Sequence, residues 1–320
     1  MLMFDGSKGG TAAICWLGLM LSGTAHAQVL DPATPYPLID QGETFKIADH
    51  TYVILDDDVR FVPNVGIVVG GLATLVIDTG VGRRNGEILL QEARKLSSNE
   101  TFFIATTHHH TEHELGASAF PASAQMIRAR AAQRDVDELG RAHMQRFSGM
   151  SANLAALLDG ADFREADVLF DDEYVLDLGG VTVRMLAVGP AHTRGDTAFL
   201  IVEDGVLFAG DVAMERFPGI RGADYSIAAW REALGRLAGL DAEIVVPSHG
   251  PIGEFSLVTA YDDYFATIQT RAHALKAQGR SADEVAELLM TELGPNYPQW
   301  RAEDLNLLGN AARIAYAEAP

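Results

Sequence analysis

Six ionisable side chains crowd into one short segment of the chain, and most are of types that bind transition metals. The segment reads His108-His109-His110-Thr111-Glu112-His113-Glu114. In an extended backbone, His108 and His110 point to the same side because they are two positions apart, so they can share one ion. Glu112 and His113 follow a turn and can address a second point nearby. Imidazole nitrogens together with a carboxylate oxygen suit zinc and related divalent ions.

The residues before this segment predict how it is positioned. Residues 102–105 form a short apolar run, which predicts a strand that ends where the histidines begin. Functional loops in α/β proteins commonly follow the carboxyl ends of strands. A solvated polar loop is the alternative, but four histidines and a carboxylate within six positions favour a metal site. His109 lies between the two paired histidines and is expected to point away from the metal.

Four further motifs follow predicted strands elsewhere in the chain. They are Asp78-Thr79-Gly80, the segment 189–196 with His192 and Asp196, the segment 207–211 that ends in Asp211, and Pro247-Ser248-His249-Gly250. Together with the histidine segment, these motifs resemble the metallo-β-lactamase superfamily, whose signature is H-x-H-x-D-H. The resemblance extends from about Phe45 to Gly253. Within the superfamily, the chain looks most similar to periplasmic zinc metallohydrolases of the general hydrolase branch.

The resemblance implies a ligand set for two metal ions. One ion would bind His108, His110 and His192, the other would bind Glu112, His113 and His249, and Asp211 would bridge them. Glu112 departs from the signature, which has Asp there, so the second ion could be moved, weakened or absent. We therefore expect two zinc ions, with a single zinc or iron as the alternative and no organic cofactor. Asp78 and Asp196 are expected to support the ligands through hydrogen bonds.

The resemblance also implies an activity. We expect a zinc-dependent hydrolase that attacks an activated carbonyl, such as an ester, thioester, lactone or lactam, with a metal-bound hydroxide. Asp211 and Glu112 are the expected catalytic carboxylates. Asp211 stands where many true β-lactamases carry Cys or Ser, which favours the general hydrolase branch. A β-lactamase proper, a mononuclear-iron oxidoreductase of thiols or persulfides, and a non-catalytic metal-binding protein remain the alternatives.

Alternating strand and helix patterns predict the fold that carries these motifs. Valine- and isoleucine-rich runs at residues 51–55, 59–62, 66–69 and 74–77 predict a meander of strands, and a second strand-rich block covers residues 168–209. Helical spacing follows each block, at residues 87–96 and 227–237. Residues 129–158 are helix-prone, with Gly140 and Gly149 as breaks, and the isolated His50, His143 and His273 are expected to be surface or core residues. The pattern predicts an α/β fold, a four-layer α/β/β/α sandwich.

The N-terminus and the composition bound the location and the partners. Lys8, an apolar run at residues 11–21 and Ala25-His26-Ala27 predict a signal peptide, residues 1–27, cleaved after Ala27. Residues 28–320 would then form one domain, periplasmic or secreted, with a helical C-terminal segment from about residue 256. The single cysteine, Cys15, lies in the signal, so no cysteine ligand is expected. A net charge of −20 disfavours nucleic acid and anionic membranes, which leaves a small-molecule substrate as the expected partner and the oligomeric state open.

Overall fold

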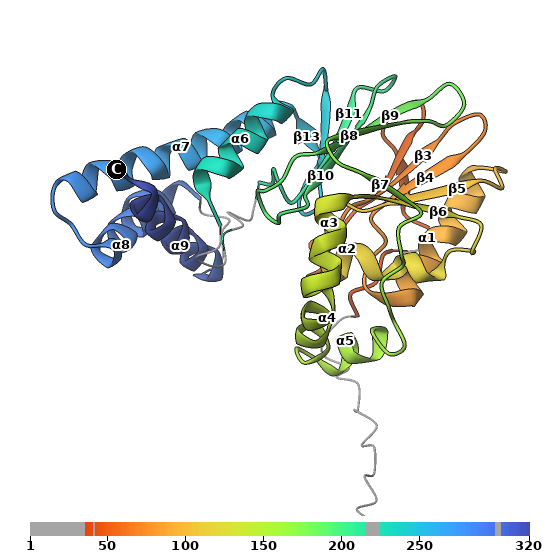
Figure 1. Cartoon of the computed structure of the whole chain (residues 1–320), viewed down its shortest axis with the longest axis horizontal. Coiled ribbons are helices and arrows are strands. Elements are labelled where there is room, and N and C mark those ends of the chain that lie inside the picture. The colour runs from red at the N-terminus through yellow and green to blue at the C-terminus, as the bar shows by residue number, and fades with distance from the viewer. Residues whose placement is uncertain (1–35, 41, 216–219, 221–224, 298–301) are drawn as a thin grey trace, which may run out of the picture.

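Two β-sheets packed face to face form the body of the molecule (Figure 1). The computed structural model describes residues 36–40, 42–215, 220, 225–297 and 302–320. The predicted signal peptide, residues 1–27, lies outside this described part. Among the described helices, none combines the length and the apolar character that crossing a membrane requires.

The first sheet brings one pair of predicted site motifs together. Its seven strands are hydrogen-bonded in chain order: β1 (Thr44–Lys46), β2 (Thr51–Ile54), β3 (Val65–Val69), β4 (Thr74–Ile77), β5 (Phe102–Ala105), β6 (Gln125–Ala129) and β7 (Val168–Phe170). Strands β1 to β4 are antiparallel, whereas β4 to β7 run parallel. Ile77 pairs with Ala105, so β4 and β5 end side by side. The Asp78 turn and the histidine segment therefore begin at the same edge of the sheet.

The second sheet does the same for the remaining motifs. Its order is β13 (Gly253–Glu254), β12 (Ile244–Pro247), β11 (Val206–Gly210), β10 (Thr197–Ile201), β9 (Thr182–Ala187) and β8 (Glu173–Asp177). Strands β11 and β12 are parallel and Gly210 pairs with Pro247. Asp211 and His249 consequently leave the sheet from neighbouring strand ends.

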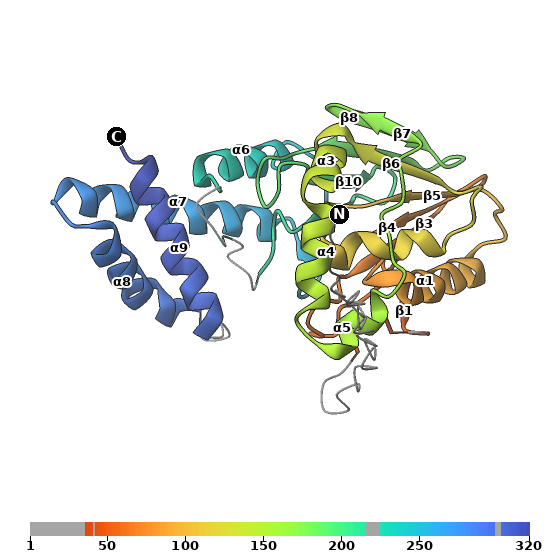
Figure 2. The ribbon, with the colours of Figure 1, turned by 60° about the horizontal axis from the view of Figure 1, so that its bottom comes forward.

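Helices cover both outer faces and complete four layers (Figures 1 and 2). The apolar face of α1 (Gly82–Leu96), with Leu89 and Ala93, packs on the first sheet, and α6 (Ile227–Leu237) and α7 (Ser256–Ala277) cover the second. Between the sheets lies a third apolar layer that includes Leu75, Met185 and Phe208. Burial of apolar surface on both faces of each sheet stabilises this arrangement. The predicted four-layer α/β/β/α sandwich is confirmed.

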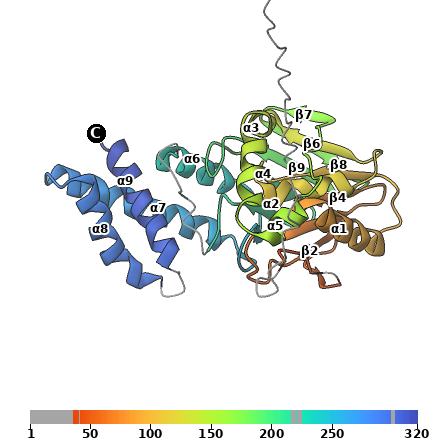
Figure 3. The same ribbon diagram turned by 90° about the horizontal axis from the view of Figure 1, so that it is seen from below.

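The C-terminal helices extend from one side of the sandwich (Figure 3). Helix α8 (Ala282–Leu293) and helix α9 (Ala302–Glu318) pack against α7 and share its apolar core. Ser281 and Glu284 form a capping box at the start of α8. The described residues from Ser256 onward are thus mostly helical.

A second helical group lies along the sandwich near the predicted ligands (Figure 2). It comprises α3 (Arg130–Asp135), a π-helical turn η2 (Val136–Gly140), α4 (Arg141–Ser148) and α5 (Ala152–Leu157). The predicted break at Gly149 is present, because Gly149 caps the end of α4. Helix α3 packs so closely on the His192 loop that a Cβ atom on Gly195 would lie 2.2 Å from Ala132 Cα. Only glycine fits at that contact.

One predicted strand, residues 59–62, is wrong. Turns replace it: Val59 N donates to Asp56 O at 2.8 Å, and Val62 N donates to Val59 O at 3.1 Å. Phe61 has a left-handed φ of 66°, which a strand does not tolerate. The apolar residues of this segment pack into two side clusters: Val62 is buried in the cluster of α1, and Phe61 is partly buried against Phe147 of α4. Their hydrophobicity therefore reflects the packing of a loop.

Candidate metal centre

The two sheets place all seven predicted ligands at their shared edge. Among the described residues, three overlapping groups have their ligand atoms within 4.8 Å of one another. The first group is His108, His110 and His192. The second is His108, His113 and Asp211, and the third is Glu112, His113 and His249. The first and third groups coincide with the two ligand sets that the sequence predicts.

Asp211 lies between these two ligand sets. Its Oδ2 atom is 3.4 Å from His192 Nε2. Its Oδ1 atom is 3.8 Å from His113 Nε2 and 4.0 Å from His249 Nε2. The two carboxylate oxygens therefore face different sets, which is the arrangement that a bridging carboxylate needs.

Asp78 holds the histidine segment in place through contacts with Thr107 and His113. Its carboxylate accepts hydrogen bonds from Thr107 N at 2.7 Å and from Thr107 Oγ1 at 2.9 Å, and it pairs with His113 Nδ1 at 2.9 Å. This last contact fixes the ring so that Nε2 of His113 faces Asp211. Asp78 has a left-handed φ of 59°, a conformation that aspartate tolerates better than most residues. Its contacts are those of a residue that orients ligands.

A buried ion pair closes the same segment, and the sequence analysis missed it. Glu114 accepts a hydrogen bond from Thr106 Oγ1 and pairs with Arg128 of β6. Both charged side chains are buried. Thr106 and Glu114 flank the ligands, so this contact joins the two ends of the loop. A lone glutamate next to a histidine motif gives no sequence sign of its partner on another strand.

The His192 loop is held by Asp196 and by helix α3. Asp196 accepts hydrogen bonds from Thr193 N and Thr193 Oγ1, both at 2.7 Å. Arg194 pairs with Asp135 of α3. The same carboxylate has its Oδ2 atom 3.8 Å from His109 Nδ1, so His109 faces α3 and away from the ligand sets. The loop that carries His192 is therefore held internally by Asp196 and joined to α3 by Arg194.

His143, which was expected to be a surface or core residue, lies beside the candidate metal centre. Its ring stacks on that of His110, with centroids 4.2 Å apart and an angle of 7° between the planes. Its Nδ1 atom lies 3.3 Å from Thr111 Oγ1, and Arg146 contacts Nε2 at 2.9 Å. The contact between Thr111 and His143 spans 32 positions, so local spacing in the sequence gives no sign of it. Only the folded chain shows it.

The protonation states of the histidines differ across the site. Burial, with the nearby imidazoles, holds the pKa of His108 well below its ordinary value. Burial and the neighbouring His192 do the same for His110. Burial alone would also lower the pKa of His113, but the carboxylates of Asp78, Asp211 and Glu112 together outweigh it and raise that pKa to about 9. His108 and His110 are thus neutral at pH 7, the form in which imidazole binds metals.

The unpaired atoms of the site fit divalent ions. Among the described residues, His108 Nε2, His113 Nε2 and Glu112 Oε2 are buried and make no hydrogen bond. Buried polar atoms are normally satisfied, and leaving them unsatisfied is costly. The opposite ring nitrogens, His108 Nδ1 and His113 Nδ1, contact Thr107 and Asp78. The Nδ1 atoms of His108 and His113 have hydrogen-bond partners, whereas their Nε2 atoms point toward the other ligands, so the residues suit the ions that the sequence predicts.

Five histidines and two carboxylates at the common edge of a four-layer sandwich define the class of metallo-hydrolase folds. The sequence model of the metallo-β-lactamase superfamily matches residues 58–249, more than half of the chain. The chain belongs to this superfamily. The predictions of the family, of the fold and of a metallo-hydrolase enzyme are confirmed. The search of curated proteins gives no match.

Solved structures share the fold at low sequence identity. A metallo-β-lactamase from Pontibacter korlensis is 21% identical with a TM-score of 0.57, over 69% of this chain and 97% of that one. The stereoselective inverting sec-alkylsulfatase Pisa1 from Pseudomonas sp. is 15% identical with a TM-score of 0.64, over 85% of this chain and 49% of that one. This chain therefore spans about half the length of the alkylsulfatase. Likeness at this level of identity establishes the fold alone.

Proposed function

We propose that the chain is an exported, zinc-dependent hydrolase with two metal ions. His108, His110 and His192 would hold one ion, Glu112, His113 and His249 would hold the other, and Asp211 would contact both. The observation that carries this proposal is the position of Asp211, whose Oδ2 lies 3.4 Å from a histidine of the first set and whose Oδ1 lies 3.8 Å from a histidine of the second.

The chemistry divides between the ions and the chain. When bound, such ions lower the pKa of water toward about 7 and polarise the bond under attack. The chain's own residues set the geometry. Asp78 pairs with His113 Nδ1, so in the neutral ring the proton lies on Nδ1 and Nε2 is the atom that would bind the ion. Asp211 fixes the separation of the two ligand sets and offers an acceptor that can orient the attacking water.

The substrate class we propose is an activated carbonyl: an ester, thioester, lactone or lactam. Water attack assisted by metal needs no nucleophilic side chain, which agrees with a chain whose one cysteine lies in the predicted signal. A sulfate ester is a second candidate. The likeness to the alkylsulfatase covers 85% of this chain, and the residues before α7 make up only about 80% of it, so the likeness extends into the C-terminal helices.

Metal analysis and a substrate panel test the proposal together. Purified protein should contain close to two zinc per chain, lose hydrolysis after chelation and regain it with added zinc. The panel should contain esters, thioesters, lactones, β-lactams and secondary alkyl sulfates. His110→Ala should abolish turnover, and His50→Ala, a histidine outside the site, should leave it unchanged. Full activity in the metal-free protein would refute the proposal, and iron with oxygen consumption would favour an oxidoreductase.

Export is a separate part of the proposal. The apolar run at residues 11–21 followed by Ala25-His26-Ala27 supports it. Protein isolated from the extracytoplasmic fraction of its own cells should begin at Gln28, as N-terminal sequencing would show. An intact Met1 in the cytoplasmic fraction would contradict export and would leave the hydrolase proposal untouched.

A further inference from the structure

We propose that Asn64 and Asp56 are positioning residues that clamp the loop carrying His249 and so create the second half of the metal centre. This inference rests on the proposed two-ion hydrolase. Both residues belong to the β2–β3 loop of the first sheet, whereas His249 follows β12 of the second. The clamp therefore joins the first sheet to the loop that follows β12 of the second sheet, beside the contact of Ser248 Oγ with Asp78 at 3.4 Å.

Asn64 makes most of the clamp. It is buried, and its side-chain amide donates to Pro247 O at 2.8 Å and to Gly250 O at 2.9 Å. Its backbone N donates to Ser248 O at 2.6 Å. The three carbonyls surround His249 in sequence, so Asn64 fixes the backbone on both sides of the ligand.

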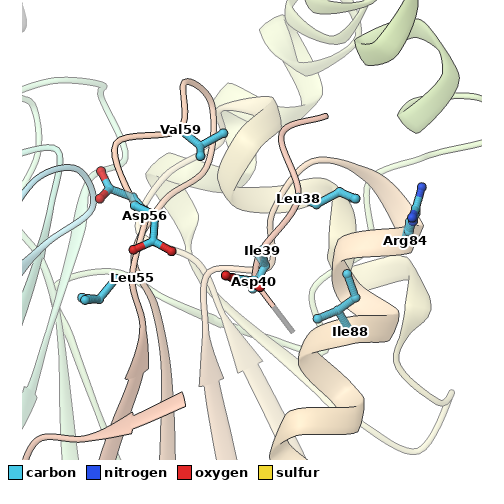
Figure 4. Close-up of a pocket in the computed structure, with 9 residues that line it drawn as sticks. Leu38, Ile39, Asp40, Leu55, Asp56, Val59, Arg84 and Ile88 are labelled. Atoms are coloured by element: carbon cyan, nitrogen blue, oxygen red, sulfur yellow. The ribbon is translucent and has the colours of Figure 1, made fainter. Parts of the chain in front are cut away.

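Asp56 completes the clamp and braces Asn64. Its Oδ2 atom accepts a hydrogen bond from Gly250 N at 2.8 Å, and its backbone N donates to Asn64 Oδ1 at 2.8 Å. Asp56 also lines a surface cavity of about 300 Å³ between α1 and the residues before β1, where Figure 4 shows it opposite Asp40 and Ile39. Asp56 thus sits at a solvent-accessible rim while Asn64 lies beneath it.

The loop needs such a clamp because of where His249 lies. The side chain of His249 is 14% exposed, whereas that of His113 in the same ligand set is fully buried. Packing therefore restrains His249 less than its partner. Gly250 has a left-handed φ of 92°, so the chain turns sharply directly after the ligand. Metal–ligand distances tolerate only about 0.2 Å, so a small shift of this backbone removes His249 from the set.

The test is stepwise zinc binding to metal-free protein, measured by competition with a chromophoric chelator. In Asn64→Ala we expect the affinity for the second ion to fall about 10- to 100-fold and the affinity for the first to stay unchanged. Asp56 lies at the rim and its side chain makes one hydrogen bond to the loop, so Asp56→Ala should give a smaller loss of the same kind. This variant serves if Asn64→Ala folds poorly. Cobalt-substituted protein should show the same selective change in its visible spectrum.

Asn85→Ala is the matched control. Asn85 is as buried as Asn64 and also makes three side-chain hydrogen bonds, to Ile39, Pro37 and Val81 in the first sheet's surroundings. It should lower the melting temperature and leave both zinc affinities in place. The clamp proposal would be refuted if Asn64→Ala lowered the affinity for both ions equally, or if Asn85→Ala lowered the affinity for the second ion alone.

Hydrogen exchange separates this inference from the proposed function. In metal-free protein, the backbone amides of residues 248–250 should exchange at least 10-fold faster in Asn64→Ala than in the wild type. If the wild-type protein binds only one ion, the two-ion proposal fails, and unchanged exchange in the loop would then reject the clamp as well. Faster exchange would show that the clamp holds the loop independently of the metal.

Discussion

Replacing His143 tests whether helix α4 supports the first ligand set. The His110–His143 stack is nearly parallel at 4.2 Å, and such aromatic pairs contribute about 0.5–1.5 kcal/mol. The contact with Thr111 Oγ1 at 3.3 Å adds about 0.5–1.5 kcal/mol if it behaves as a typical hydrogen bond. Alanine returns about 0.5 kcal/mol as a better helix former. His143→Ala should therefore weaken the support of His110 by about 1–2 kcal/mol.

The expected result is a selective change in metal binding. About 1.4 kcal/mol corresponds to a tenfold change in affinity. His143→Ala should therefore lower the affinity for the first zinc ion about 10-fold and change the affinity for the second by no more than about twofold. His143→Phe keeps the stack but not the contact with Thr111, so it should recover about half of the loss. Gln145→Ala, an exposed position on the same helix, is the control. Competition titration with zinc measures both steps. Wild-type affinities in His143→Ala, or equal losses in the Ala and Phe variants, would refute the reasoning.

Further predictions concern the carboxylates, the pH and the metal. Asp211→Ala should lower the affinity for both ions at least 10-fold, as metal analysis would show, because its two carboxylate oxygens face different ligand sets. Glu112→Asp should lower the affinity for the second ion only, because the shorter side chain withdraws its carboxylate oxygen from that ligand set. An unchanged zinc titration would contradict this. His113, with a pKa of about 9, is protonated at pH 7, so second-ion affinity should rise about tenfold per pH unit up to pH 9, checked by calorimetry in two buffers. First-ion affinity should stay flat there, because His108 and His110 are already neutral. Chelation should lower the melting temperature, and free zinc at 100 times its Kd should raise the free energy of unfolding by about 2.7 kcal/mol.

Much of the fold could be predicted because its strands are local apolar runs between turn residues. Strands β4 and β5, for example, consist of Thr74–Ile77 and Phe102–Ala105, and all but one of their residues are buried. Residues 59–62 show the limit of this reasoning. Their hydrophobicity matches that of a strand, yet Val62 and Phe61 pack against two different helices. Hydrophobic periodicity does not distinguish a paired strand from a packed loop.

The candidate site divides in the same way. The histidine segment is local, so its composition alone indicated metal chemistry. The loops of His192, Asp211 and His249 could be joined to it only through the resemblance to a known family, since no spacing links them. The supporting residues escaped altogether. Asn64 meets its partners 183 and 186 positions away, and an asparagine in a loop has no sequence pattern that foretells this.

The arrangement of buried polar atoms argues for function independently of any relative. Burying imidazoles and carboxylates at a sheet edge costs free energy, and apolar side chains of similar size commonly serve stability as well or better. Here the hydrogen bonds are placed unevenly: Thr107 and Asp78 contact the outward nitrogens of His108 and His113, while the inward nitrogens make none among the described residues. A polar cluster that served only stability would satisfy both sides. Satisfied outward atoms and converging inward atoms are what binding of a cation requires, and the clamp at Asn64 extends the same logic to the backbone around His249.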